Sequence, residues 1–222
     1  MAGGSMHLPA LHGYDPAMRK SFMAVFVFAA VPVLHMLACQ AQGRIDSGFT
    51  AIQIQAADRD SQKAGLLKKL IRQLAEATSP ANAGILAGTI RKLWRDSSSA
   101  SVRLLMERAA ILIAEHEQKP ALGILDSIVE IAPDYGEGWF MRAVLLFQMN
   151  ELGRAMHDVG QALDLNPSHF DALRQLGLIL NRLGDQKGAL NAYQRAEKLY
   201  PLLPGIQDAI KELKTQIEGE AI

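Results

Sequence analysis

The side chains best suited to catalysis or metal binding are few in this 222-residue chain, and those beyond residue 41 lie far apart. Three histidines stand there, His116, His157 and His169, and no two of them show the spacing beside a glutamate that zinc hydrolysis uses. No glycine-rich loop follows a strand pattern to hold a phosphate, and no serine occupies the setting of a strained nucleophilic turn. The sequence therefore predicts a protein without enzymatic activity, metal or cofactor.

Cys39, the only cysteine of the chain, is the one residue with a candidate covalent chemistry. It follows an apolar run over residues 22–38, which Arg19 and Lys20 precede. The order basic, apolar and small is typical of a secretory signal peptide. We therefore expect a leader and signal peptide over residues 1–41, and an exported protein that is periplasmic or held at a membrane by a lipid.

The fate of Cys39 after export has three alternatives. Cleavage after Ala41 would release a soluble protein that begins at Gln42. The segment from Met36 to Cys39 also resembles the lipobox of bacterial lipoproteins, in which the cysteine is acylated, although Met36 stands where that motif prefers leucine. The third alternative is an uncleaved membrane anchor. Because the cysteine is alone, a disulfide within the chain is excluded.

The elements beyond the apolar run are set by a 34-residue period. Four columns of the period each have a physical role: a proline that ends a helix, a bulky apolar residue, a small residue that lets two helices approach, and a residue type that tolerates a positive φ in the turn. In that order the columns are Pro133, Pro167 and Pro201; Leu105, Trp139 and Leu173; Ala109, Ala143 and Gly177; and His116, Asn150 and Gly184. The period therefore predicts successive pairs of antiparallel helices.

These columns resemble those of tetratricopeptide repeat proteins, whose unit is a 34-residue helix-turn-helix. The resemblance covers residues 102–203 and implies an all-α, right-handed superhelical solenoid of antiparallel helix pairs. In one column Arg108 and Arg142 replace the usual apolar residue, which Leu176 retains. The three repeats are expected at 102–135, 136–169 and 170–203.

The segments on either side of the repeats also have helical patterns. Residues 61–97 predict a hairpin of two helices, which we interpret as a divergent leading repeat, and residues 97–99 predict a helix cap of serines. Residues 42–60 lack a clear period and are expected to be a linker. Residues 204–218 predict an amphipathic helix that caps the last repeat, as the open end of a solenoid requires.

Composition agrees with a helical protein-binding module. The chain is 49% hydrophobic, which allows a sizeable core, and it lacks β-branched runs bounded by hairpin turns. Its 23 basic residues balance 23 acidic residues, so nucleic-acid binding is not expected. Contact with a membrane is expected only through the signal peptide or a lipid on Cys39.

The resemblance implies that the first helix of each repeat lines a concave groove, which is where a partner would bind. Helical phase points sixteen residues into it, among them Glu137 and Asp171, and the set runs from apolar to basic. The ten taken as candidate binding residues are Met106, Ala110, Ile113, Phe140, Val144, Phe147, Arg174, Leu178, Asn181 and Arg182. Some relatives hold an acidic C-terminus there with a clamp of Lys, Asn and Arg. Met106 and Ala110 occupy the places of Lys and Asn, so that clamp is not recognisable. The apolar end favours an apolar helix or extended segment instead.

Several functions fit these observations. The leading interpretation is a non-enzymatic adaptor that binds a protein or peptide of the bacterial cell envelope. The alternatives are a membrane-tethered structural or assembly lipoprotein and an accessory subunit of a periplasmic enzyme. The leading hairpin or the linker could also fold into the groove, which would make Phe140 and Phe147 ordinary core residues.

Overall fold

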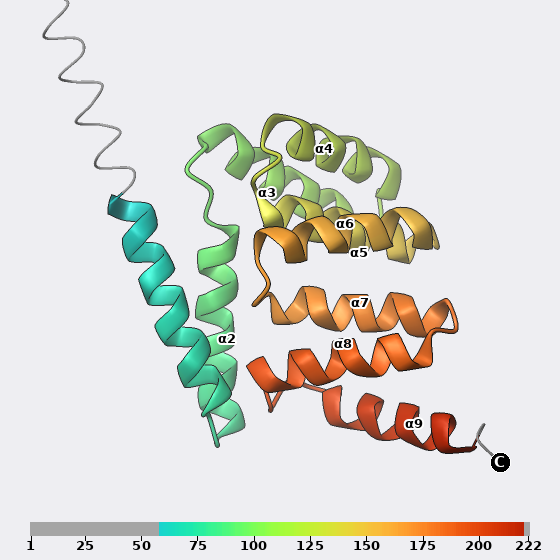
Figure 1. Ribbon diagram of the computed structural model, residues 1–222. Coiled ribbons are helices and arrows are strands. Elements are labelled where there is room, and N and C mark those ends of the chain that lie inside the picture. Colours follow the sequence, from blue (N-terminus) through green and yellow to red (C-terminus); the bar gives the residue numbers. More distant parts are fainter. Residues whose placement is uncertain (1–57, 220–222) are drawn as a thin grey trace, which may run out of the picture. The chain divides into compact units, whose positions relative to one another are not determined.

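The computed structural model describes residues 58–219, and these residues are helical without any strand. The predicted signal peptide, Cys39 and nearly all of the predicted linker lie outside the described residues. The chain divides into two units at Asp60, and the unit Ser61–Ile222 contains all of the repeats. After a first helix over residues 58–75, the helices are α2 Pro80–Arg95, α3 Ala100–Ala114, α4 Gln118–Ile131, α5 Gly136–Gln148, α6 Leu152–Leu165, α7 Phe170–Arg182, α8 Gln186–Leu199 and α9 Ile206–Gly219 (Figure 1).

The all-α repeat architecture is confirmed: α3 pairs with α4, α5 with α6, and α7 with α8, and each pair packs on the next. The turn inside each pair uses the predicted residues. His116, Asn150 and Gly184 have φ angles of 63°, 61° and 85°. Each turn closes with a backbone hydrogen bond of 2.8 to 2.9 Å to the carbonyl of a leucine in the last turn of the first helix, the αL geometry that ends helices.

The helices of the third repeat approach most closely where the small column meets a tyrosine. Gly177 of α7 is buried, and a methyl group added there would overlap the ring of Tyr193 on α8. The second repeat has Ala143 and Val159 in the same two columns. A smaller residue on one helix therefore accompanies a larger one on the other.

We expect Gly177→Ala to lower the free energy of unfolding by about 1–3 kcal/mol through overpacking. The overlap with Tyr193 outweighs the gain of about 1 kcal/mol that alanine brings to a helix interior. Urea unfolding measures the change, and Gly160→Ala is the matched control, since nothing lies within 4 Å of a methyl group at that helical position. Equal effects of the two substitutions would contradict the close approach.

The C-terminal helix α9 covers the end of the last repeat. Ile206, Ile210 and Leu213 are buried in one cluster with Ala189 and Tyr193 of α8. The helix begins two residues later than the sequence pattern suggested because Gly205 has a φ of 74°, outside the helical region. Its outer side is charged, as a solenoid cap requires.

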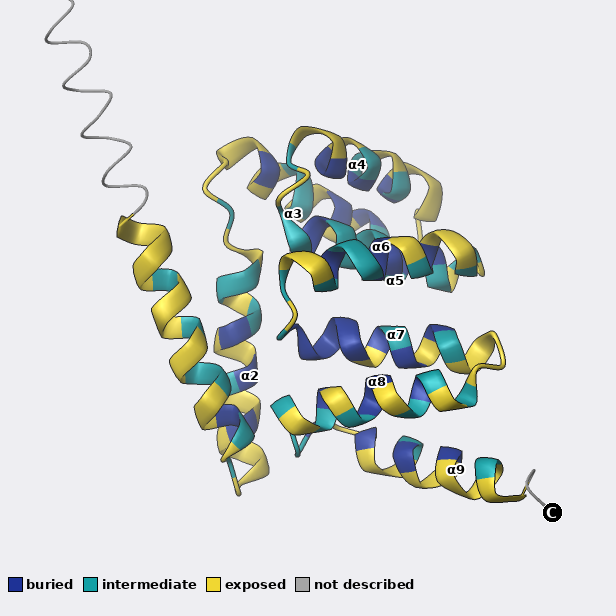
Figure 2. Cartoon of the chain, in the orientation of Figure 1, coloured by how far each residue is buried: buried dark blue, intermediate teal, exposed yellow. Residues whose placement is uncertain are grey.

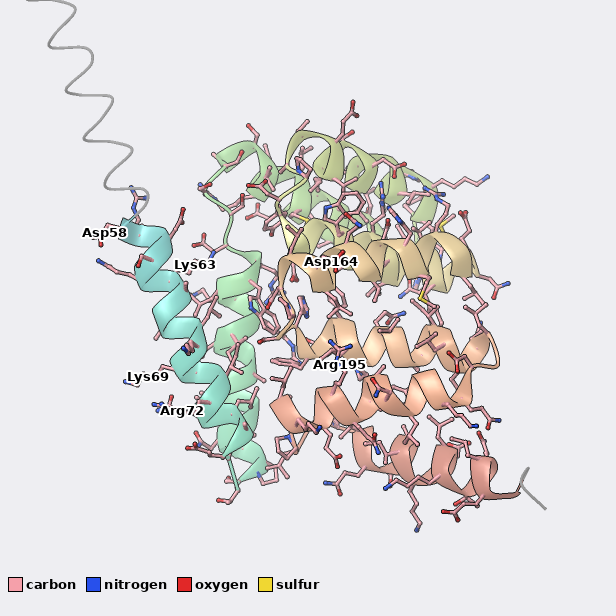
Figure 3. All side chains as sticks on the ribbon, in the orientation of Figure 1. Asp58, Lys63, Lys69, Arg72, Asp164 and Arg195 are labelled. Carbon is pink, nitrogen blue, oxygen red and sulfur yellow. The ribbon has the colours of Figure 1, made fainter. Side chains whose placement is uncertain are left out.

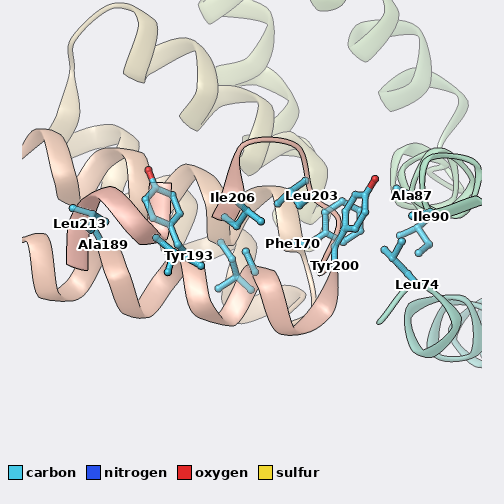
Figure 4. Close-up of a cluster of buried hydrophobic side chains, with 14 residues drawn as sticks. Leu74, Ala87, Ile90, Phe170, Ala189, Tyr193, Tyr200, Leu203, Ile206 and Leu213 are labelled. Carbon is cyan, nitrogen blue, oxygen red and sulfur yellow. The ribbon is translucent and has the colours of Figure 1, made fainter. Parts of the chain in front are cut away.

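The N-terminal hairpin forms as expected but does not stack on the first repeat. Leu74, Ala87 and Ile90 of the hairpin are buried in one cluster with Phe170 and Tyr200, at the start of α7 and the end of α8 (Figure 4). Successive repeats pack in chain order, whereas α2 contacts α5 rather than α3 most extensively among the repeat helices. Apolar patterning identifies the buried side of α2, but it does not identify the helices that cover it.

Candidate functional site

The ten predicted groove residues lie on α3, α5 and α7, and none of them is fully buried. Five are half-buried: Met106, Ile113, Phe140, Val144 and Phe147. The other five are exposed: Ala110, Arg174, Leu178, Asn181 and Arg182. The apolar members are therefore anchored in the repeats while part of each remains accessible.

The apolar members of this predicted set rest on the cores of the repeats. Met106 and Ile113 pack against the buried cluster around Leu125. Phe147 packs against a second cluster, which contains Val159 and Ile179. Core residues of the repeats thus fix the positions of these side chains, as expected for a binding surface of defined shape.

The basic end joins the apolar end through Arg182. Its guanidinium carbon lies 5.1 Å from the centre of the Phe147 ring, a cation–π arrangement. One of its nitrogens also donates to Oδ1 of Asn150, at 3.3 Å, across the turn of the preceding repeat. The sequence placed Phe147 and Arg182 in the groove separately, and the structure brings them into contact.

Phe140 belongs to a different environment, because its ring faces an aromatic cluster at the edge of the repeats. We call Trp94, Phe140, His169 and Phe170 the edge cluster. The ring centre of His169 lies 4.2 Å from that of Trp94 and 4.6 Å from that of Phe140, and Trp94 also contacts Phe170 at 4.9 Å. The hairpin therefore covers this end of α5 in part, whereas Phe147 is not packed against the hairpin cluster.

A buried acidic residue fastens the hairpin to α7. Asp171, at the second position of that helix, is 7% exposed and accepts two hydrogen bonds from Arg91 of α2, at 2.6 and 2.9 Å. The hydrogen bonds that Arg91 donates to Asp171 raise the pKa of Arg91 above its ordinary value, so the guanidinium stays charged. Arg91 also lies 5.2 Å from the Phe170 ring centre. Figure 2 shows the run of buried residues at the start of α7.

Glu137 and His169 form a second buried pair, with Oε2 and Nε2 at 3.2 Å. Nδ1 of His169 accepts the backbone N–H of Ala172, also at 3.2 Å, which leaves Nε2 to carry the proton that faces Glu137. Both ring nitrogens are therefore engaged in contacts that cap α7 and join it to α5. This pair orders a turn between repeats, and neither nitrogen is free to activate a nucleophile.

A cavity of about 490 Å³ lies between the first helix of the hairpin and the turns between repeats. Its lining includes apolar side chains of that helix, such as Leu67 and Ile71, together with Trp94 and His169. Lys63 donates to the backbone carbonyl of Asp96 at 2.5 Å, and Figure 3 shows it on the same helix as the outward Lys69 and Arg72. The hairpin therefore lies against the repeats but leaves this cavity between them unfilled.

Tyr135, directly before α5, lines the same cavity. Its hydroxyl donates to the carbonyl of Arg95 at 2.8 Å, and burial raises the pKa of this phenol above its ordinary value. The tyrosine therefore stays neutral and a donor. Within residues 58–219, no group of three or more His, Cys, Asp or Glu side chains is arranged to hold a metal ion, and no helix is long and apolar enough to span a membrane.

The sequence did not identify the contacts of the edge cluster. Glu137 and Asp171 follow the helical phase of the groove, yet both are buried under neighbouring elements. One available signal was the aromatic Trp94 at the end of α2, next to acidic and basic residues, since an aromatic on a predicted hairpin needs a covering surface.

Comparisons with known proteins agree with the repeat fold. The tetratricopeptide repeat family model matches residues 136–169. A TPR repeat-containing protein of Rhizobium etli is 35% identical over 153 residues, which are 69% of this chain and 75% of the relative. Similar solved structures include the Sgt2 TPR domain of Aspergillus fumigatus, with 20% identity, a TM-score of 0.52 and coverage of 55% of this chain and 83% of that one.

Two further structures are similar to about half of the chain. The first TPR domain of Spaghetti (RPAP3), bound to an HSP90 peptide, has 18% identity, a TM-score of 0.51 and coverage of 53% and 93%. The TPR2B domain of yeast Sti1, in a pHsp70 complex, has 15% identity, a TM-score of 0.50 and coverage of 53% and 99%. At these identities the likeness is one of fold.

Proposed function

This chain belongs to the tetratricopeptide repeat proteins, and from that premise we propose that it is a non-enzymatic adaptor whose repeat groove binds a segment of a partner protein. The fold is typical of modules that bind proteins and peptides. Two of the similar structures, RPAP3 and yeast Sti1, are described as complexes with an HSP90 peptide and with pHsp70. We propose that this chain also binds a segment of another protein, but we do not propose that it binds those partners.

The observation that carries this proposal is the apolar stretch of the groove beside Arg182. Met106, Ile113, Val144 and Phe147 keep accessible surface, and none of them packs against the hairpin cluster within the described part of the chain. Apolar side chains that stay accessible on one face of a protein can mark a protein-binding site. The hairpin covers the Phe140 end of α5 in part and leaves these four residues outside its cluster.

The chemistry of the groove suits an amphipathic partner helix or extended segment. Met106, Ile113 and Phe147 can accept apolar anchors at helical spacing. Arg182 and Arg174 keep accessible surface at the other end and can pair with a carboxylate. Met106 and Ala110 occupy the places of the Lys and Asn of an acidic-tail clamp. We therefore assign the main contribution to partner affinity to the apolar anchors.

A charge placed in the groove should prevent partner binding without unfolding the protein. We expect Val144→Lys to reduce partner recovery at least 10-fold, because a half-buried valine in the middle of α5 is replaced by a hydrated ammonium. Val144 serves better than Phe140, whose ring is part of the edge cluster. A photo-crosslinker at position 144, with mass spectrometry of the adducts, identifies the partner, and a pull-down against that partner then measures the loss.

The matched control is Ile131→Lys, since Ile131 is 57% exposed at the end of α4 and is not a groove residue. This variant should recover the partner as well as the wild type does. Circular dichroism would verify that both variants keep the helical content. A partner that binds Val144→Lys as tightly as wild type would exclude the groove as the binding site.

The cellular location is the second part of the proposal. The order of residues 19–43 supports export to the periplasm, with either Gln42 or acylated Cys39 as the first residue of the mature protein. N-terminal sequencing of the protein from its own cells distinguishes these products, and labelling with radioactive palmitate that is lost in Cys39→Ser supports the lipid anchor. A protein recovered from the cytoplasm with residues 1–41 intact would contradict export.

A further inference from the structure

The first repeat exposes an apolar face that the other repeats bury. The third and tenth residues of each repeat are equivalent positions on its first helix. In the second repeat these are Gly138 and Leu145, and in the third they are Ala172 and Ile179; all four are buried. In the first repeat they are Leu104 and Ile111, which are 67% and 48% exposed.

The buried examples show what normally covers this face. A methyl group added at Gly138 would lie 2.8 Å from Cγ2 of Ile128, on the second helix of the preceding repeat. Leu145 is likewise in one cluster with Ile128 and Leu125. The face that carries Leu104 and Ile111 is therefore the side of α3 on which a preceding repeat would stack.

Within the described part of the chain, that preceding element is not in place. The hairpin of residues 61–95 is the only described helical segment of this unit upstream of α3, and it docks on the start of α7 and the end of α8. At the other end of the array, α9 packs on α8 and covers the end face of the last repeat. The repeats are thus closed at the end of α8 and open at α3.

The charges between the two exposed apolar residues are self-complementary. Glu107 and Arg108 stand midway between Leu104 and Ile111 on the same side of α3, and both are exposed. If two α3 helices cross antiparallel about an axis between Glu107 and Arg108, Leu104 of one lies opposite Ile111 of the other. The same crossing sets each Glu107 against the other Arg108. Within residues 58–219 no ion pair engages either charge.

We propose that the face formed by Leu104, Glu107, Arg108 and Ile111 binds a second copy of this chain, as an antiparallel pair of α3 helices about a twofold axis. A twofold interface uses the same patch on both copies, which a self-complementary pattern satisfies. Head-to-tail stacking of copies would need the end of α8, which α9 occupies. One helix from each copy buries less than the roughly 1,200 Å² of a standard interface, so the dimer is weak and depends on concentration.

The test is a charge reversal followed on the protein purified from cells that express it. Sedimentation velocity over a range of concentrations should show a monomer–dimer equilibrium for the wild type. Glu107→Arg and Arg108→Glu should each weaken the dimer by about 10-fold or more, because every substitution acts twice across the axis and sets like charges together. Ile131→Ser is the control, an exposed apolar residue outside this face.

Mixing the two single variants distinguishes this arrangement from general charge effects. A Glu107→Arg copy is complementary to an Arg108→Glu copy, so their mixture should recover dimers, and the double variant should dimerise with itself. Leu104→Ser together with Ile111→Ser should leave a monomer. A wild type that stays monomeric up to about millimolar concentration, or a mixture that fails to recover dimers, would overturn the proposal. Both outcomes are independent of whether Val144→Lys loses a partner in the groove.

Discussion

Arg142→Ala is expected to lower the free energy of unfolding by about 3–5 kcal/mol, because it leaves a buried carboxylate without its partner. Asp158 of α6 has a side chain that is 1% exposed, and it accepts two hydrogen bonds from Arg142 of α5, at 2.6 and 2.9 Å. The hydrogen bonds that Arg142 donates to Asp158 raise the pKa of Arg142, so the guanidinium stays charged. Chemical denaturation monitored by circular dichroism measures the loss.

The third repeat supplies the compensating variant. Its residues in the same two columns are Leu176 and Ala192, an uncharged pair. Arg142→Leu combined with Asp158→Ala should therefore recover most of the stability that Arg142→Ala loses, since replacing both partners of a buried pair is often neutral. A double variant that unfolds as easily as Arg142→Ala would show that the charges themselves hold these helices together.

An exposed ion pair in the same repeat provides the control for this experiment. Arg154 is 51% exposed and contacts Glu151 at 2.7 Å. Arg154→Ala should change the free energy of unfolding by less than about 1 kcal/mol, because solvent screens such pairs. The contrast between the two arginines tests whether burial, and not the number of charges, determines the cost.

The parts of the fold that the sequence predicted are those with local causes. The turn residues His116, Asn150 and Gly184 have the positive φ angles expected of them, because the conformation depends on residue type. Ser99 caps α3 as predicted, with its hydroxyl accepting the backbone N–H of Val102 at 3.3 Å. Such features depend on a few neighbouring residues, so they can be predicted from a single sequence.

The features that the sequence did not predict depend on residues far apart in the chain. Arg142 departs from the apolar pattern of its column because Asp158 and Asp126, each 16 residues away, satisfy its charge. Arg91 pairs with Asp171 across 80 residues. A helical pattern shows that α2 has an apolar side, but many surfaces of a solenoid could cover it. The docking of the hairpin therefore emerges only from the packing.

That docking has a direct consequence for Trp94, whose replacement should release the hairpin from the repeats. Trp94 stacks on His169 with ring centres 4.2 Å apart and contacts Phe170 at 4.9 Å. Trp94→Ala removes a large, half-buried aromatic side chain from this packing, and we expect it to cost about 3 kcal/mol, the lower end of the range for core aromatics. We expect this loss in the docking of the hairpin, because the clusters of the first two repeats contain no hairpin residue.

Hydrogen exchange distinguishes local release from global unfolding. In Trp94→Ala the amides of α2 should exchange at least about 100-fold faster, since this equilibrium reports on local opening, while those of α5 and α6 change little. Ile85→Ala is the control on the same helix, because Ile85 is 70% exposed and should cost under about 0.5 kcal/mol. If α2 and α5 lost protection together, the hairpin would be part of one cooperative unit with the repeats. It would then be a structural component of the array and could not open independently of the groove.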